Sequence, residues 1–171
     1  MARAFYLAIL ILQMIIRFKK GKNQSRHKPD TLTCIRDDGS ITWTYLHPGF
    51  AIQDFAHYVV ETTLGYQHSF LGLVAKGYDI PDFNLPKTKR PFEIPEEALN
   101  TEVIVGLLQT DLLESLRGNA DHCELLRDYS ELLPVKITDA QLETMQQKLQ
   151  ALSQQWHDLQ PGESITLQFD T

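Results

Sequence analysis

Apolar and polar residues alternate in several short stretches near both ends of the chain, and this period of two is typical of strands buried on one face. Ile16 and Phe18 alternate with charged neighbours, and residues 31–36 repeat the pattern. Close to the C-terminus, residues 165–169 alternate in the same way after a Pro-Gly turn. Because a sheet becomes stable with three or more strands, these stretches predict one antiparallel sheet.

A hairpin is predicted around the segment 37–40, which reads Asp-Asp-Gly-Ser. An Asp-Gly pair supplies the positive φ angles that a tight hairpin turn requires. Ile41, Trp43 and Tyr45 then alternate with threonines and complete the second hairpin strand. Further aromatic residues follow as far as Phe70, and we expect this group to form the core between hairpin and first helix, or else to line a ligand pocket.

The sequence between the strands carries helix start and stop signals and predicts about four helices. The predicted helices cover 51–64, 96–117, 120–133 and 138–158, and a further short helical piece lies near 71–76. Residues from 77 to 95, rich in proline, are expected to form a long ordered loop. The chain is therefore predicted to have an α+β fold, with a small antiparallel sheet of three or four strands and helices packed on one side.

The helix at 138–158 has the clearest signals. Thr138 and Gln141 form a capping-box pair at its start. Five apolar residues then recur at alternating spacings of three and four: Leu142, Met145, Leu149, Leu152 and Trp156. Such a stripe packs on the chain's own sheet or on the helix at 96–117, or it forms a homo-oligomer contact through 138–158. Its length favours packing within the chain, because a sustained coiled coil needs about three to four heptads.

Length, composition and charge narrow the classes of protein. The 171 residues suit one domain, and 43% hydrophobic with 22% charged residues is typical of a globular chain. The net charge of −6 argues against a protein that covers nucleic acid with its whole surface. Residues 17–28 nevertheless carry six basic side chains and no acidic one. A solvated loop between strands explains this segment best, and contact with an anion or nucleic acid is the alternative.

The N-terminal residues are treated separately. Residues 5–16 are almost all apolar, but this run is shorter than the roughly 20 residues that span a bilayer. No cleavage site of the signal-peptide kind follows it. Met14 offers a second start, so we expect 1–13 to be an upstream extension and 14–171 to be one α+β domain. The two cysteines, Cys34 and Cys123, suit free thiols in the cytoplasm, and no membrane association is predicted.

Polar residues share one face of the first predicted helix. Gln53, His57 and Glu61 fall at i, i+4 and i+8, so they are stacked along the helix. Asp54 lies three residues before the histidine, beside the same stripe. Apolar residues occupy the other directions and can anchor the helix in the core. This stripe is the strongest candidate for a site in the sequence.

Two kinds of chemistry suit the stripe. His57 and Glu61 could share a divalent metal, because imidazole and carboxylate are common metal ligands, and His68 or His47 could complete the site. His57, Glu61 and Asp54 could instead perform acid–base catalysis, with the glutamate orienting the imidazole. The alternative is structural, since a buried histidine is often satisfied by a carboxylate one turn away. No known cofactor motif accompanies the stripe, so a divalent metal is the one cofactor that these residues suggest.

Three segments together resemble a group of uncharacterised bacterial proteins. They are the hairpin Arg36-Asp37-Asp38-Gly39-Ser40, the helix segment 54–61 that resembles HDLxHYxVE, and the segment 69–80 that resembles GFxGLxAxGxxI. The likeness covers roughly residues 14 to 82. The sequence departs from the pattern at Gln53, where the group has a histidine, and a metal site built on an HxxxH pair would lack one ligand here. The resemblance implies no activity.

These observations favour a non-enzymatic binding or interaction protein of the bacterial cytosol. No complete catalytic set is present, and the stripe at 138–158 can meet a partner. A metal-dependent or histidine-based enzyme that uses the Gln53, His57 and Glu61 face is the alternative. It predicts that this face opens onto a cavity, and that His57 keeps a ring nitrogen free.

Overall fold

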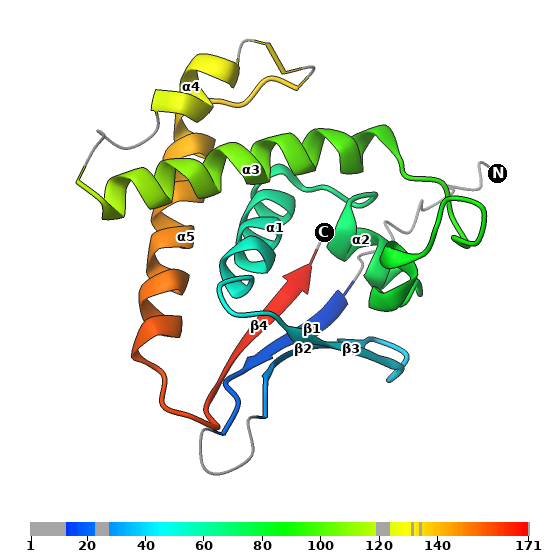
Figure 1. Cartoon of the computed structure of the whole chain (residues 1–171). Helices are drawn as coiled ribbons and strands as arrows, with labels where there is room; N and C mark the ends of the chain where they lie inside the picture. The colour runs from blue at the N-terminus through cyan, green and yellow to red at the C-terminus, as the bar shows by residue number, and fades with distance from the viewer. Residues whose placement is uncertain (1–12, 23–27, 119–123, 131, 134, 171) are drawn as a thin grey trace, which may run out of the picture.

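The computed structural model describes residues 13–22, 28–118, 124–130, 132–133 and 135–170. Its four strands are β1 (Gln13–Lys19), β2 (Asp30–Arg36), β3 (Ile41–Leu46) and β4 (Ser164–Asp170). They form one antiparallel sheet in the order β3-β2-β1-β4, so the first and last strands lie side by side (Figure 1). The predicted α+β sheet, with its hairpin and its C-terminal strand, is confirmed.

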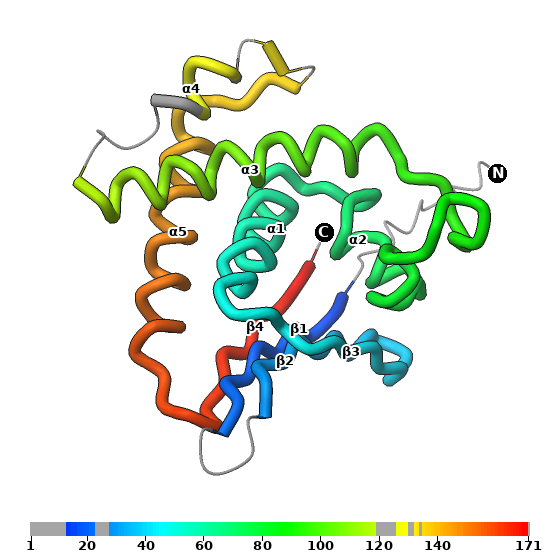
Figure 2. Tube along the Cα trace, viewed as in Figure 1, coloured from blue at the N-terminus to red at the C-terminus, as the bar shows by residue number. Residues whose placement is uncertain are grey.

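The helices pack on one face of this sheet (Figure 1). They are α1 (Ala51–Leu64), α2 (Phe70–Ala75), α3 (Glu96–Leu116), α4 (Glu124–Ser130) and α5 (Asp139–Asp158), with a 3₁₀ helix η1 (Ile80–Asn84). The trace in Figure 2 shows α1 over the sheet, α5 along its side and α3 running across both. The segment expected to be a loop after residue 76 thus contains a helical turn, η1. Of the helix predicted at 120–133, the part at 120–123 lies outside the described residues.

The core lies between the sheet and the helices. Alternate residues of β1, among them Ile16 and Phe18, are buried while their neighbours are exposed. The ring of Phe18 packs on Phe55 of α1 with centroids 4.4 Å apart. On α5, the stripe residues Leu142, Met145 and Leu149 are buried in the same cluster, and Leu152 and Trp156 pack against it. This stripe therefore packs on the chain's own core, and the homo-oligomer contact through 138–158 stays a prediction.

Strand β3 turns its aromatic residues away from the core, which corrects the expectation that they fill it. Trp43 and Tyr45 are 50% and 57% exposed, whereas Thr42 between the sheet and η1 is buried. The register with β2 places Thr42 opposite Cys34, whose side chain faces inward. Thr42 and every second residue after it in β3 therefore also face inward. The Thr42 hydroxyl accepts a hydrogen bond of 3.0 Å from the backbone N–H of Ile80. A buried threonine thus ties the sheet to η1.

The N-terminal predictions fall largely outside the described part of the chain. Strand β1 begins at Gln13, and residues 1–12 are not described, so the extension predicted for 1–13 stays a prediction. None of the helices that the structure describes is long and apolar enough to cross a membrane. Cys34 is a free, buried thiol, and Cys123 lies outside the described residues.

Candidate functional site

Helix α1 positions the polar stripe that the sequence singled out. Its apolar side, which includes Phe55, Val59 and Val60, is fully buried against the sheet and α5. The helix ends at Gly65, whose φ of 69° is left-handed and whose N–H bonds back to the carbonyl of Glu61. Glycine adopts this conformation without the penalty of a Cβ atom, which explains why the helix stops here. The apolar side fixes how α1 is rotated, so the side chains of His57 and Glu61 face α2 and α3.

Glu61 is fully buried and holds the start of α2. Its Oε1 accepts a hydrogen bond of 3.2 Å from the N–H of Leu71, and its Oε2 accepts one of 3.0 Å from the N–H of Gly72. These N–H groups lie in the first turn of a helix, where they have no partner within the helix. A Cβ atom on Gly72 would lie 2.5 Å from the backbone carbonyl of Gln67, so only glycine allows this approach. The glutamate thus acts as a cap that comes from another helix.

His57 is 4% exposed, and both ring nitrogens face carboxylates. Its Nδ1 lies 3.3 Å from Oε1 of Glu61, and its Nε2 lies 3.4 Å from Oε1 of Glu102 on α3. The ring also meets the edge of Phe70, with centroids 5.3 Å apart. The imidazole therefore links α1 with α2 and α3, and neither nitrogen is left free for a metal or a substrate.

The charges around His57 favour its protonated form. Burial alone would lower the pKa of His57, but the hydrogen bond to Glu61 and the charges of Glu61, Glu102 and Asp54 outweigh it, so the pKa lies above its ordinary value. Burial raises the pKa of Glu61, while the bonds from His57 and from the two backbone N–H groups of α2 oppose that rise. The pair therefore behaves as a buried, mutually satisfied unit.

His68 does not join the other two residues of the predicted metal set. Its backbone N–H donates a hydrogen bond to Glu97 at the start of α3, and its Nδ1 lies 3.9 Å from Oε2 of the same residue. Its side chain is 56% exposed, whereas His57 and Glu61 are buried. Within the described part of the chain, no three histidine, cysteine, aspartate or glutamate side chains are grouped to hold a metal ion.

The N-terminal turn of α1 borders an open cavity of about 330 Å³. Its aromatic walls come from β3, the start of α1, α2 and η1: Tyr45, Phe50, Phe70 and Phe83. Its polar groups come from the same elements: Thr44, His47, Gln53, Asp54 and Asn84. Gln53 and Asp54, two members of the predicted stripe, thus face a cavity, while the other two members are buried beneath α2 and α3.

Asp54 is the charged group of this cavity. Among the residues that the structure describes, none donates a hydrogen bond to its carboxyl oxygens. Burial raises the pKa of Asp54 to about 6, an effect that nearby His57 opposes and Glu102 reinforces. Behind it, burial and the charge of Asp54 raise the pKa of the Cys34 thiol to about 12, so this cysteine is no nucleophile. The carboxyl is mostly ionised at neutral pH, and no lysine or arginine is among the described residues that line the cavity.

Arg36 is a structural residue of the site that the sequence reasoning missed. It is 8% exposed, and its guanidinium donates hydrogen bonds of 2.6 Å to the carbonyls of Val74 and Tyr78 and one of 2.8 Å to Asp79. These bonds fix the end of α2 and the entry to η1, which supplies a cavity wall. The sequence carried a signal for its burial, because the period of two that places Leu32 and Cys34 on the inner face of β2 also places position 36 there.

No protein-family model matches the sequence, and neither curated proteins nor solved structures give a match.

Proposed function

We propose that this chain is a non-enzymatic binding protein of the bacterial cytosol, and that the cavity beside α1 accepts a small organic cation. One observation carries the proposal: the carboxyl of Asp54, without a hydrogen-bond donor among the described residues, lines a cavity with four aromatic walls. None of the described residues that line it is lysine or arginine. The pKa of about 6 leaves this carboxyl mostly ionised at neutral pH.

An organic cation suits the cavity for two reasons. A carboxylate in a partly dehydrated site attracts positive charge more strongly than one in water does. The faces of aromatic rings carry negative potential and stabilise ammonium groups, most strongly those with methyl substituents that are weakly hydrated. A volume of about 330 Å³ lies at the small end of ligand sites, so the ligand has the size of a simple amine or quaternary ammonium.

The arrangement gives less support to the metal-dependent or histidine-based enzyme. A general base needs a nitrogen within reach of its substrate, but both nitrogens of His57 face carboxylates and the side chain is 5% exposed. Glu61 is engaged with two backbone N–H groups of α2. The polar groups of both residues already have partners inside the protein, so we infer that His57 and Glu61 stabilise the fold.

Calorimetric titration with choline tests the proposal. Choline is to be compared with 3,3-dimethylbutan-1-ol, which has nearly the same shape but no charge. We expect choline to bind at pH 7.5, the neutral alcohol to bind at least about tenfold more weakly, and Asp54→Asn to abolish the difference. The matched control is Glu143→Gln, which removes an exposed carboxylate of α5 and leaves choline binding unchanged.

The pH dependence provides a second readout of the same site. Because the cation needs the ionised carboxylate, its affinity is expected to fall as the pH drops through about 6, the pKa of Asp54. Equal binding of choline and the neutral alcohol, or unchanged choline binding by Asp54→Asn, would refute the proposal. Saturable binding of a divalent metal at this cavity in place of choline would revive the metal alternative.

A further inference from the structure

Helix α3 is apolar on two opposite faces. One face, which includes Ile104, Val105 and Leu108, is buried against α1 and the core. The other face is exposed, and we call it the outer seam: Leu99, Val103, Gly106, Thr110 and Leu113. Its members alternate at spacings of four and three residues, the period of a helix that packs along another helix. Leu99, Val103 and Leu113 are 56%, 49% and 44% exposed, so nothing among the described residues covers this seam.

We propose that the outer seam is the contact between two copies of this chain, with the two α3 helices antiparallel and crossing at Gly106. The seam is self-complementary in this arrangement. Placing Gly106 against Gly106 of the second copy sets Leu99 against the second copy's Leu113, and Val103 against its Gln109, one residue before Thr110. A two-fold axis requires such a match, because a residue that contacts a given position of the second copy must be contacted by that same position in return.

Gly106 favours a close crossing of helices. Glycine in a helix interior is destabilising relative to alanine, and here a Cβ atom would meet no neighbour within 4 Å. The need for glycine is therefore not explained by packing inside the chain. Two helices that cross at glycine can bring their backbones nearer than those that cross at larger residues.

Charge distinguishes the antiparallel arrangement from a parallel one. The seam begins beside Glu96, in the first turn of α3, and ends beside Arg117, whose side chain is 65% exposed and also pairs with Glu114 of the same helix. The same register that pairs the leucines brings Glu96 near Arg117 of the second copy. A parallel pair would instead place the acidic ends together and align the two helix dipoles. The ends of α3 thus support the same geometry as its middle.

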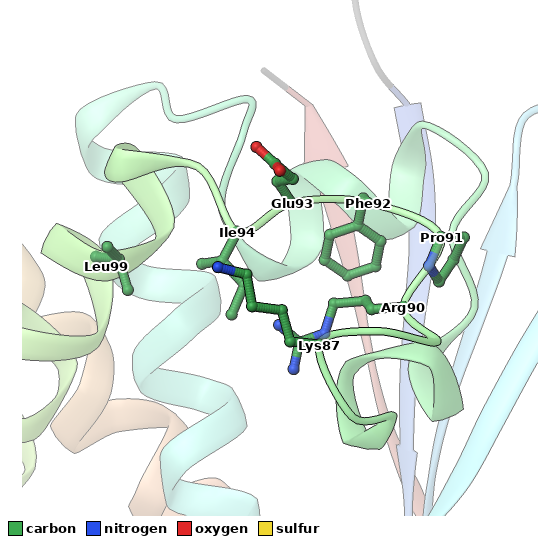
Figure 3. A pocket seen from close by; sticks show the side chains of 7 residues that line it. All are labelled: Lys87, Arg90, Pro91, Phe92, Glu93, Ile94 and Leu99. Atoms are coloured by element: carbon green, nitrogen blue, oxygen red, sulfur yellow. The ribbon is translucent and has the colours of Figure 1, made fainter.

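A hollow at the N-terminal end of α3 extends the seam. It measures about 550 Å³ and is lined on one side by Leu99 and Ile94 and on the other by Phe92 and Arg90 (Figure 3). Leu116, at the other end of α3, is 66% exposed. In the antiparallel pair, Leu116 of the second copy comes to this end of the helix, where the hollow can receive it. The sequence predicted a homo-oligomer through α5; the exposed apolar stripe is on α3.

Sedimentation of the full-length protein over a range of concentrations tests the proposal. We expect a dimer whose dissociation constant rises at least about tenfold in Val103→Glu, because two charges would be buried in the seam. The control is Ile41→Glu, which makes the same kind of change at a similarly exposed residue of the sheet and should leave the dimer intact. Gly106→Leu is a second variant, expected to raise the melting temperature of the monomer and yet to weaken the dimer.

Disulfide cross-linking checks the direction of the helices. In a Cys123→Ser background, a mixture of chains carrying Leu99→Cys with chains carrying Leu113→Cys should form a mixed covalent dimer on oxidation. Chains with Leu99→Cys alone should not. A strictly monomeric protein, a dimer that Val103→Glu leaves unchanged, or rapid cross-linking between two Leu99→Cys chains would overturn the proposal. So would a monomer that dimerises only after removal of residues 1–12, since that segment would then occupy the seam.

Discussion

Two neighbouring turns of α1 carry similar polar residues and yet have opposite roles. Asp54 lines an open cavity and has no hydrogen-bond donor among the described residues, whereas His57 and Glu61, one and two turns later, are buried and satisfied. All three lie along the same side of the helix, at spacings of three and four residues. The difference lies in what covers each part: α2 and α3 lie over the second part of the stripe, whereas the first part borders an open cavity with aromatic and polar walls. Periodicity identifies a face of a helix, and the packed neighbours decide its function.

The two carboxylates also differ in their effect on stability. The charge of Glu61 is met by His57 and by two backbone N–H groups, so its loss would leave several buried polar groups without partners. No donor among the described residues bonds to the carboxyl of Asp54, and burial raises its pKa to about 6. Removing the first should destabilise the fold, and removing the second should stabilise it. A buried charge that opposes folding is typical of a functional site.

The largest effect is expected for Glu61→Ala. It leaves His57 and the N-terminal N–H groups of α2 without their acceptor, and breaking a buried charged pair from one side typically costs about 3–5 kcal/mol. We expect the free energy of unfolding, measured with urea at pH 7, to fall by that amount. The control is Glu102→Ala, which removes the other carboxylate next to His57. Because the Glu102 side chain is 59% exposed, its loss should cost under about 1 kcal/mol.

Equal losses for Glu61→Ala and Glu102→Ala would contradict this account. They would mean that His57 depends on its two carboxylates alike, and that the cap on α2 adds little. A Glu61→Gln variant separates these contributions, because the amide oxygen can still accept a hydrogen bond while the charge is absent.

The next effect has the opposite sign. Asp54→Asn should raise the free energy of unfolding at pH 7.5 by roughly 2–3 kcal/mol, the free energy that corresponds to a pKa raised from 3.8 to about 6. Since the folded-state pKa is the higher one, ionisation of this carboxyl opposes folding. The opposing term is absent below about pH 3.8 and grows as the pH rises toward 6.

Urea titrations of wild type and Asp54→Asn between pH 4 and pH 8 measure this term. The two proteins should have similar stability near pH 4 and should diverge up to about pH 6, beyond which the difference stays constant. A variant that is less stable than wild type at pH 7.5 would assign Asp54 a structural role. In that case its loss of choline binding would no longer identify a site.

The sheet, the cap of α5 and the main helices could be predicted because their signals are local. Alternation defined β1 and β4, the Asp-Gly turn defined the hairpin, and the capping box defined α5. The inward side of β3 could not be read this way, because Ile41, Trp43 and Tyr45 point outward and Thr42 points inward. Only the pairing with β2 and the contact with η1 decide that orientation.

The candidate site was only half visible in the sequence. The stripe on α1 was found, but its division into a buried part and a cavity part depends on where α2 and η1 pack. Phe83 and Asn84 of the cavity wall lie about 30 residues beyond Asp54 and follow no motif. Long-range bonds hold this segment in place, from Arg36 to Val74 and Tyr78 and from Ile80 to Thr42. The resemblance to an uncharacterised bacterial group stays a prediction.

The smallest effect concerns the cap of α5, which contrasts with the cap of α2. Thr138 accepts a hydrogen bond from the N–H of Gln141, and the Gln141 side chain bonds back to its N–H. Thr138→Ala should therefore lower the free energy of unfolding by about 1 kcal/mol in a urea titration. Thr144→Ala changes the same residue type inside the same helix and should alter it by less than about 0.5 kcal/mol.

A loss equal to that of Glu61→Ala would show that a local cap matters as much as a buried one. We expect the local cap to be weaker because Thr138 is exposed, so water replaces its hydrogen bonds when the side chain is removed. Water does not reach the first turn of α2 beneath the buried Glu61. The cap of α5, which is the easier one to recognise in the sequence, is thus expected to contribute less to stability. The cap expected to contribute more is that of α2, and it comes from Glu61 on another helix, ten positions before Leu71.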